Sequence, residues 1–551
     1  MAARGSGVQR VNMSFDYIVV GAGSAGAVIA SRLSEDPAVR VALLEAGGEA
    51  RHPFLHMPLA FPLAYRRWAW LAKGEPEPGL LGRPLDLLGG EVIGGSSSVN
   101  GMVYARGNSM DYDLWHQRGL NGWGYADVLP YFKRLETSWR GESAYHGTSG
   151  PVRVNRVDPA GGLYELFERS AVAAGHSVSP DLCGVQELGI GKLEATISAG
   201  RRSSTAVSYL KAARKRSNLL VITNARARRI LLAGRRAIGV EYSQDGEVKS
   251  LACRREVVVS AGTIKSPQLL MLSGIGPGGH LREAGITPVV DLPAVGQNLG
   301  EHPLCMMSWK ARGNTFVRHL RYDRATLSML RWALAKTGPM STTICYAMLY
   351  ASTQPGLLRP DVQLVATELE REAHGWFPGL TARPTDAFGQ LIMCLHPLSR
   401  GWVKLRSSEP EATPQVMYNL LSNQSDVNSL VAGARIAREI YSQSPQAQLV
   451  SHELRPGADL GSDAELEQFI RESAVAAMHH VGTCSMGEGI KAVVDGELRV
   501  HGVERLRVAD ASVMPDVPGG NTNIPTVMIG EKAADLIRGR RLPAADLRTC
   551  A

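Results

Sequence analysis

The chain has 551 residues, a net charge of +8 and an ordinary hydrophobic fraction of 44%. Its length exceeds what one compact core normally holds, so we expect a soluble globular protein of two or three domains. The densest basic cluster, residues 226–236, straddles an alternating apolar segment that is typical of a solvated strand edge, so we do not expect a nucleic-acid-binding protein.

The cysteines and the N-terminus indicate the compartment. Seven cysteines are widely spaced and form no C-x-x-C pair, which predicts free thiols, a reducing compartment and no metal site. The first fourteen residues are polar and basic and contain no apolar signal core. No apolar run reaches membrane-spanning length. We therefore expect a cytoplasmic protein without a transmembrane segment, and the oligomeric state stays open.

The first structured unit is predicted to bind a dinucleotide. An apolar run at residues 17–20 precedes a G-x-G-x-x-G turn, a helical pattern and a second apolar run at residues 41–44. The first glycine permits a tight turn, the second lets the backbone approach a pyrophosphate, and the third lets the helix pack closely. The acid that ends the second run can accept both ribose hydroxyls. These residues are Gly21, Gly23, Gly26 and Glu45, and the unit alone fits NAD or FAD equally.

The next segments alternate between loops and strands. Residues 89–101 are so rich in glycine and serine that they predict a loop whose backbone approaches a flat or charged group. An NAD enzyme has no need for such a loop. Residues 219–242 alternate like a hairpin with a turn at Gly234, and residues 256–262 read as a buried parallel strand.

The C-terminal half changes texture twice. Residues 301–460 contain short runs, such as 362–365 and 402–405, that predict an antiparallel sheet with helices on one face. Residues 505–510 then form another strand ending in an acid, and a helix is expected over 525–536. The simplest interpretation is a nucleotide domain built from separate parts of the chain, with a substrate domain inserted.

Three segments carry further motifs: GGSSSVNG at residues 94–101, GTIKSPQLLMLSGIG at residues 262–276, and HHVGTCSMG at residues 479–487, which is followed by residues 510–515 and 521–526. Together they resemble the signatures of the glucose–methanol–choline (GMC) family of FAD-dependent oxidoreductases. The resemblance implies an α/β fold, with a Rossmann-like FAD-binding domain and an inserted α+β substrate domain that contains an antiparallel sheet. The expected FAD-binding parts are residues 13–160, 200–300 and 475–551, and the substrate-binding domain is residues 301–470.

The resemblance also implies which residues contact the cofactor. The first loop meets the pyrophosphate, an acid meets the adenosine ribose, and the glycine–serine loop lines the flavin. A later strand contacts adenine through its backbone, and two C-terminal segments meet the pyrophosphate, the ribityl chain and the flavin ring. The implied residues are Gly21, Gly23, Ser24, Ala25, Gly26, Glu45, Ala46, Gly95, Ser96, Asn100, Gly101, Met102, Val103, Ala227, Asp510, Ala511, Pro525 and Thr526.

The expected catalytic pair is His479 and Asn521. Alcohol oxidation by a flavin requires a base for the hydroxyl proton, and histidine titrates near neutral pH. A nearby amide can hold the oxygen without competing for the proton. His480 is an alternative base, because neighbouring residues in an extended chain point to opposite sides. Asn523 is the alternative partner.

Several positions depart from the family pattern. Glu91 stands where a cation is usual, which removes a positive charge near the flavin loop. His480 replaces a common proline, and Glu301 replaces a more usual aspartate. Val99 occupies the place where some relatives carry a histidine bonded to the flavin. Valine cannot form that bond, so we expect FAD to be bound non-covalently.

The resulting functional hypothesis is FAD-dependent oxidation of a primary alcohol to an aldehyde, with hydride transfer to flavin N5. The electron acceptor is O₂, a quinone or a dye. A lyase or a flavin photodecarboxylase on the same scaffold, or a non-catalytic FAD-binding module, is the alternative. The substrate is expected to be an aromatic or medium-chain alcohol. The loop aromatics Trp68, Trp70, Trp376 and Phe377 are candidates for lining or covering the entrance.

Overall fold

The computed structural model describes residues 14–159 and 162–547. The inferences about residues 1–13 and Cys550 fall outside this range. The remaining six cysteines, which lie within it, are free thiols as expected. None of the helices in the described part of the chain is long and apolar enough to cross a membrane.

The first layer is a seven-stranded mixed sheet in the order β11-β2-β1-β14-β13-β12, with β25 beside β14. Strand β1 lies parallel between β2 and β14, and β25 pairs in parallel with the end of β14. These strands end at the same edge, where the glycine turn begins. The strands are β1 Ser14–Val20, β2 Val41–Leu44, β11 Leu219–Ile222, β12 Arg226–Ala233, β13 Arg236–Gln244, β14 Glu247–Val259 and β25 Leu506–Val508.

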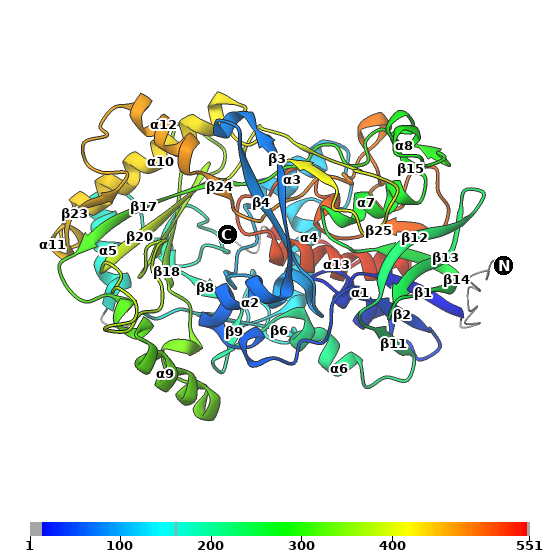
Figure 1. Ribbon diagram of the computed structural model, residues 1–551, viewed down its shortest axis with the longest axis horizontal. Helices are drawn as coiled ribbons and strands as arrows, with labels where there is room; N and C mark the ends of the chain where they lie inside the picture. The colour runs from blue at the N-terminus through cyan, green and yellow to red at the C-terminus, as the bar shows by residue number, and fades with distance from the viewer. Residues whose placement is uncertain (1–13, 160–161, 548–551) are drawn as a thin grey trace.

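Two helices cover this sheet beside its glycine turn. Helix α1 (Gly26–Leu33) follows β1, and α13 (Asn523–Ile537) packs against it from the far end of the chain (Figure 1). Almost every residue of α13 is buried. A helix that is apolar on most of its circumference is stable only inside a protein, so α13 forms the centre of this domain.

One of the local predictions for this sheet needs correction. Residues 219–222 are not an arm of a hairpin: they form β11, which pairs in parallel with β2. The hairpin is formed instead by β12 and β13, and its turn is at Gly234 as expected. The buried parallel strand predicted at 256–262 is confirmed as the last part of β14, which is parallel to β1 and β25, whereas the first half of β14 is antiparallel to β13. A left-handed residue, Asn224, separates β11 from the hairpin.

The second layer is a seven-stranded sheet in the order β23-β17-β20-β19-β18-β7, with β24 beside β17. Its pairings are antiparallel, as predicted for the inserted domain. Helices α5 (Leu163–Ala173), α10 (Gln424–Ser442) and α12 (Asp463–Ser473) lie on one side of it (Figure 1). Its strands are β7 Gly189–Lys192, β17 Pro303–Ala311, β18 Cys345–Ala351, β19 Val362–Thr367, β20 Ala387–Cys394, β23 Val450–Arg455 and β24 Val475–Ala476.

The predicted run at 402–405 is not part of this sheet. It forms β21 (Trp402–Lys404), which pairs with β22 (Gln415–Met417) in a separate two-stranded sheet. Two of the strands in the main sheet, β7 and β24, come from outside residues 301–470. The division of the chain into domains stays a prediction at these boundaries.

A long hairpin and several shorter elements connect the two layers. Strands β3 (Ala69–Glu77) and β4 (Arg83–Gly90) form the hairpin, which crosses the middle of the molecule (Figure 1). The remaining named elements are α2 Phe61–Trp68, α3 Ser109–Gln117, α4 Tyr125–Leu135, β5 Glu136–Ser138, β6 Val152–Arg156, β8 Glu194–Ala195, β9 Ile197–Ser198, β10 Arg201–Arg202, α6 Lys211–Ala213, α7 Lys265–Leu272, β15 Ile275–Gly276, α8 Gly278–Glu283, β16 Val290–Asp291, α9 Tyr322–Ala335 and α11 Gln446–Leu449.

Candidate active site

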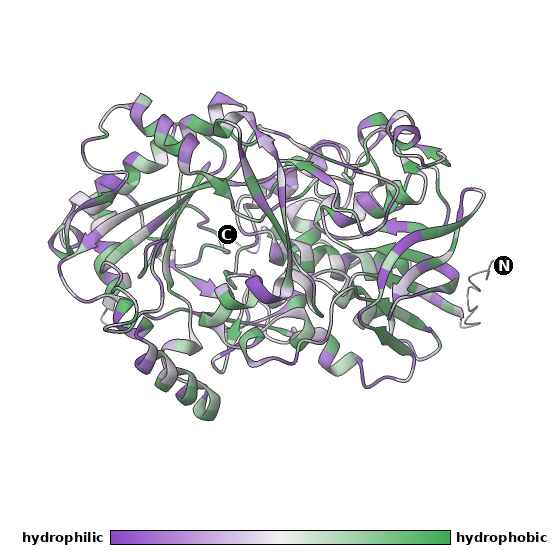
Figure 2. Cartoon of the chain, in the orientation of Figure 1, coloured by the Kyte–Doolittle hydropathy of each residue, from purple (hydrophilic) through white to green (hydrophobic). Residues whose placement is uncertain are grey.

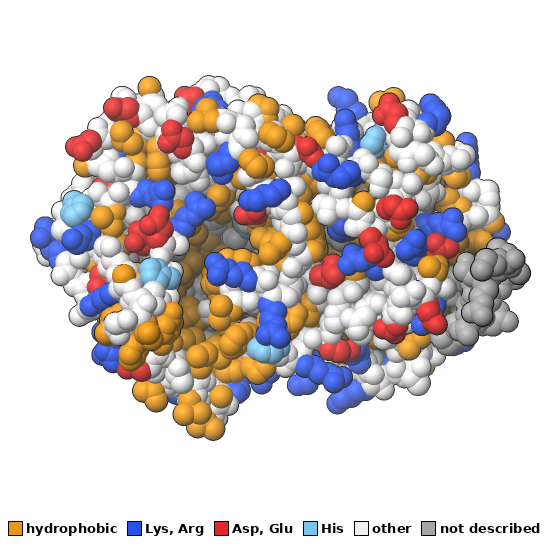
Figure 3. All heavy atoms as spheres, in the orientation of Figure 1, with side chains coloured by type: hydrophobic (Ala, Val, Ile, Leu, Met, Phe, Trp, Pro, Cys, Tyr) orange, Lys and Arg blue, Asp and Glu red, His pale blue; other side chains and the backbone are white. Residues whose placement is uncertain are grey.

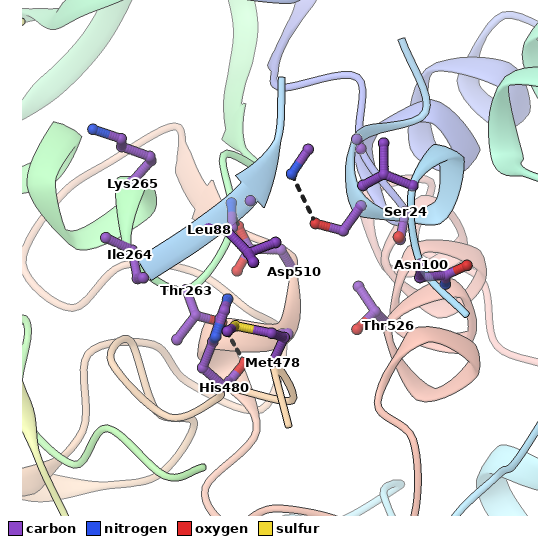
Figure 4. A pocket seen from close by; sticks show the side chains of 18 of the residues that line it. Ser24, Leu88, Asn100, Thr263, Ile264, Lys265, Met478, His480, Asp510 and Thr526 are labelled. Atoms are coloured by element: carbon purple, nitrogen blue, oxygen red, sulfur yellow. Dashed lines mark hydrogen bonds between the residues drawn. The ribbon is translucent and has the colours of Figure 1, made fainter. Parts of the chain in front are cut away.

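One cavity of about 570 Å³ joins the two layers and collects most of the predicted site residues. Figure 4 shows Ser24, Asn100 and Thr526 on one side of it and Thr263 and Met478 toward the other. Gly26 and Pro525 are the two predicted residues that do not line it. Those that do are Gly21, Gly23, Ser24, Ala25, Glu45, Ala46, Gly95, Ser96, Asn100, Gly101, Met102, Val103, Ala227, His479, Asp510, Ala511, Asn521 and Thr526.

The turn after β1 is packed too tightly for side chains. Gly21 has a φ of 99°, and a Cβ atom there would lie 2.3 Å from the carbonyl oxygen of Ser260. A Cβ on Gly26 would lie 1.9 Å from the carbonyl oxygen of Gly21. Gly26 therefore acts by letting α1 begin against the strand, which explains why it lies outside the cavity lining. Gly23 has no such contact and faces the open space.

Glu45 closes the same end of the cavity. Its Oε2 accepts a hydrogen bond from the Ala22 N–H at 2.9 Å, and its Oε1 accepts one from the Gly47 N–H at 2.9 Å. Burial raises the pKa of this carboxyl to about 7. The two backbone bonds fix the side chain at the end of β2, where its remaining lone pairs can accept ribose hydroxyls.

The glycine–serine loop packs directly on the first turn. Gly95 has a φ of 52°, and a Cβ there would lie 2.7 Å from Cα of Gly23. Behind the loop, the buried Arg202 donates to Oδ1 of Asn100 at 2.7 Å. Burial lowers the pKa of Arg202 to about 9, and its Nε and Nη2 have no hydrogen-bond partner among the described residues. The loop backbone is thereby held against the first turn from both sides.

Asp510, which follows β25, organises the middle of the cavity. Its Oδ2 accepts hydrogen bonds from the Gly262 N–H at 2.8 Å and the Ser266 hydroxyl at 2.6 Å. Its Oδ1 accepts from the Ser512 N–H at 2.8 Å. These bonds join two of the segments that carry the family resemblance. Pro525 and Thr526 follow in the first turn of α13, and only Thr526 reaches the cavity.

His479 and Asn521 face each other across the other end of the cavity. The distance between Nε2 of His479 and Nδ2 of Asn521 is 3.0 Å. Oδ1 of Asn521 is buried and has no hydrogen-bond partner within the described chain. A hydroxyl placed here therefore meets a nitrogen lone pair, an amide donor and an unused acceptor.

A second histidine fixes the protonation of His479. Nε2 of His302 lies 2.9 Å from the Leu395 carbonyl oxygen, so this nitrogen must carry the proton. Burial lowers the pKa of both imidazoles to about 3, so each carries one proton. Nδ1 of His302 is then an acceptor, and it lies 3.0 Å from Nδ1 of His479. His479 must donate from Nδ1, which leaves the lone pair on Nε2, the atom that faces Asn521.

His480 and Asn523, the alternatives for the base and its amide partner, form other hydrogen bonds. Nδ1 of His480 lies 3.3 Å from Oε2 of Glu301, while its backbone carbonyl accepts from the Thr263 hydroxyl at 2.8 Å (Figure 4). Oδ1 of Asn523 accepts from the Ser24 hydroxyl at 2.8 Å. The geometry thus pairs His479 with Asn521, and it ties Asn523 to the first loop.

Glu301 holds the backbone of both His302 and His479 in place. Its Oε1 accepts from the backbone N–H groups of His302 at 2.9 Å and His479 at 2.8 Å. Sequence reasoning noted Glu301 only as a departure and missed His302. In the sequence, the available signal for His302 was that an acid and a histidine stand together directly before a strand.

The cavity is not short of positive charge, contrary to the expectation from Glu91. This carboxylate accepts from Arg226 at 2.7 Å, and Lys265 lies nearby. Burial, followed by the charge of Arg226, lowers the pKa of Lys265 to about 8. Its ammonium lies 5.1 Å from the ring centre of Trp70. Trp70 is the only one of the four loop aromatics that lines this cavity among the described residues.

Comparison with known proteins agrees with this arrangement. Two family models described as GMC oxidoreductase match residues 15–304 and 397–530. The chain belongs to the GMC oxidoreductase family. This GMC oxidoreductase is 40% identical to an oxygen-dependent choline dehydrogenase from Brucella canis, covering 96% of each chain. It is 42% identical to one from Burkholderia multivorans, covering 96% of this chain and 94% of the relative.

Solved structures show the same fold. A pyridoxine 4-oxidase from Mesorbium loti superposes with a TM-score of 0.86 at 29% identity, over 96% of this chain and 100% of that one. A formate oxidase from Aspergillus oryzae gives a TM-score of 0.89 at 25% identity, over 96% and 98%. The predicted fold and family are confirmed, and the enzyme is an oxidoreductase that acts on CH–OH groups.

GMC oxidoreductases bind FAD, and the cavity fits this cofactor. The turn at Gly21–Gly26 brings bare backbone and a helix N-terminus to one end, which suits a pyrophosphate. Glu45 suits the ribose, and the loop around Asn100 suits the ring. FAD, as expected, is the cofactor. Val99 is 3% exposed, and as a hydrocarbon it offers no atom for a covalent bond.

Proposed function

We propose that this GMC oxidoreductase oxidises an uncharged, apolar primary alcohol to an aldehyde, with His479 as the general base. The observation that carries the proposal is the 3.0 Å contact between Nε2 of His479 and Nδ2 of Asn521. Because His302 holds the proton of His479 on Nδ1, the Nε2 lone pair is available to a substrate hydroxyl. FAD, bound non-covalently, supplies the acceptor for the hydride at its N5 atom.

His479 and Asn521 have different roles toward the substrate hydroxyl. A substrate hydroxyl replaces the direct bond between His479 and Asn521, donating its proton to Nε2 and accepting from Nδ2. As the proton moves to His479, negative charge develops on the substrate oxygen. The Asn521 amide stabilises this charge in a buried site, where a hydrogen-bond donor counts for more than it does in water. His302 holds the neutral imidazole in the required tautomer before the transfer and still accepts from its Nδ1–H afterwards.

The side chains that line the cavity favour an apolar substrate. The antiparallel sheet contributes Leu304, Leu391 and Met393 to the lining, with Leu304 directly opposite Met393. Cys345 and Met478 add further apolar surface. An apolar chain or ring gains free energy from burial against such a wall, roughly 0.8 kcal/mol for each buried CH₂ group.

A quaternary ammonium gains no counter-ion from this lining. The acids of the cavity are Glu45, Glu91 and Asp510, and each already accepts hydrogen bonds from the chain itself. Trp70, which could bind a cation, already faces the ammonium of Lys265. A buried cation without a partner is costly. Choline, the substrate class in the names of the relatives, is therefore disfavoured in this cavity.

Anaerobic mixing of the FAD-loaded enzyme with a panel of alcohols tests the proposal. The panel pairs choline with 3,3-dimethylbutan-1-ol (called dimethylbutanol below), in which carbon replaces the nitrogen of choline, so that the shape is the same and the charge is absent. We expect dimethylbutanol, benzyl alcohol and hexanol to bleach the flavin in the dark much faster than choline does. Recolouring on exposure to air identifies O₂ as the acceptor, and a lack of recolouring indicates a quinone. If no alcohol bleaches the flavin in the dark, the lyase or photodecarboxylase alternatives replace this proposal.

A further inference from the structure

Helix α9 presents a leucine stripe to solvent. Leu327, Leu330 and Leu334 are 65%, 54% and 80% exposed, and their spacing of three and four residues places them on one face. The opposite face contains Trp332, which is 3% exposed and packs against the domain. Figure 2 shows hydrophobic residues along the protruding length of this helix. An apolar stripe on the outer face of a helix marks an interaction surface.

A neighbouring turn extends this surface. Phe377 and Leu380 are 36% and 78% exposed, and a bridge between Arg321 and Trp376 joins their loop to the start of α9. Figure 3 shows hydrophobic side chains gathered where α9 lies in Figure 1, beside a hollow in the same face. We call this surface the α9 patch; it consists of Leu327, Leu330, Leu334, Phe377 and Leu380.

The charges beside the α9 patch are mainly positive. Arg318, Arg324 and Arg331 are exposed, and none of them forms an ion pair with a described residue. Asp323, the acid of the first turn of α9, is already paired with Arg321 at 2.6 Å. A second copy of the chain in a symmetric dimer would bring the same cations together, which is unfavourable. In an anionic lipid bilayer the headgroups match the cations, and the acyl chains beneath them match the leucines.

The inner face of α9 adjoins the active-site cavity. Trp332 shares a hydrophobic cluster with Met57, Ala60 and Met340. The chain runs directly from Ala60 to Phe61, which lines the cavity, and Thr343 lines it shortly after Met340. A surface that binds the outer face of α9 therefore lies close to the cavity wall.

We propose that the α9 patch docks this enzyme peripherally on a lipid bilayer that contains anionic headgroups. The leucines enter the boundary between headgroups and acyl chains, and the arginines contact the lipid phosphates. The adjacent cavity then lies beside a phase in which apolar alcohols and quinones concentrate. The docking itself rests on the α9 patch and the arginines beside it, and it does not depend on the alcohol chemistry.

Vesicle flotation of the FAD-loaded enzyme tests the docking. We expect binding to phosphatidylcholine vesicles that contain phosphatidylglycerol, weaker binding to phosphatidylcholine alone, and a decrease with added salt. The triple variant Leu327→Ser/Leu330→Ser/Leu334→Ser should lose on the order of 1,000-fold in partitioning, because each buried leucine contributes roughly tenfold. A matched control, Val185→Ser/Leu398→Ser/Ile490→Ser, replaces three similarly exposed residues at separate positions outside the α9 patch and should bind like the wild type.

Three results would overturn the proposal. One is a wild-type enzyme that does not float with anionic vesicles. Another is a leucine triple variant that binds as tightly as the wild type. The third is a concentration-dependent dimer, seen by analytical ultracentrifugation, that the leucine triple variant abolishes while neither protein binds vesicles. Both triple variants should oxidise a water-soluble alcohol at the wild-type rate, which shows that the folded site is intact.

Discussion

Replacing His302 tests how the tautomer of the proposed base is set. The side chain bridges the Leu395 carbonyl and Nδ1 of His479 through contacts of 2.9 and 3.0 Å. In His302→Leu, Nδ1–H of His479 loses its acceptor inside the protein. A buried donor without a partner costs about 1–3 kcal/mol. The imidazole can relieve this cost by moving its proton to Nε2, which removes the lone pair that receives the substrate proton.

This cost gives the size of the expected effect. A shift of roughly 1.4–2.8 kcal/mol in the tautomer equilibrium lowers the fraction of His479 that keeps its lone pair on Nε2 by about 10- to 100-fold. We therefore expect flavin reduction by a saturating alcohol to slow by that factor, with little change in KM. His302→Gln should recover most of the rate, since its amide can accept from His479 and donate to Leu395. Neither variant touches the residues that are proposed to contact FAD.

Anaerobic stopped-flow absorbance of the flavin is the assay, with FAD content and thermal unfolding measured for each variant. A structural role alone would make the Leu and Gln variants equally slow or equally unstable. Equal rates in His302→Leu and His302→Gln would refute the tautomer argument. Wild-type rates in His302→Leu would refute any role for His302 in positioning His479.

Three further predictions concern stability and the site. The pKa values of His302 and His479 are about 3 in the folded protein and about 6.5 in the unfolded chain. The free energy of unfolding is therefore highest above about pH 6.5, and it decreases as the pH is lowered below 6.5, by roughly 1.4 kcal/mol per pH unit for each imidazole. Urea unfolding at several pH values should show this slope, and an unchanged slope in His302→Gln would contradict it. Gly26→Ala, with its clash of 1.9 Å, should release FAD on gel filtration, unlike Gly279→Ala, which meets no atom within 4 Å. Asn521→Ala should slow flavin reduction about 100-fold and Asn523→Ala less than tenfold; the reverse order would exchange their roles.

Much of the cofactor end could be predicted because its constraints are local. The glycines of the first turn and Glu45 lie within one strand–helix–strand unit, where spacing alone fixes their relative positions. The helix expected over 525–536, with a proline near its start, matches α13 within two residues at its start and one at its end. The parallel strand β11 was mistaken for a hairpin arm, because a short apolar run does not reveal which strand it pairs with.

The residues that were missed act through contacts distant in sequence. His302 and His479 are 177 positions apart, and only the folded chain shows that their rings meet. Arg226 and Glu91 are 135 positions apart, so the charge that appeared to be missing at Glu91 comes from another strand. Sequence patterns report local geometry well, whereas the partner of a buried polar group depends on tertiary packing.

We propose that His479 takes the proton of an alcohol while FAD takes the hydride. The anaerobic rate of flavin reduction by dimethylbutanol in the wild type and in His479→Ala, at matched FAD content, tests this step. We expect rapid reduction in the wild type and a rate lower by roughly 10²–10⁴-fold in the variant. Reduction of His479→Ala at the wild-type rate would contradict it.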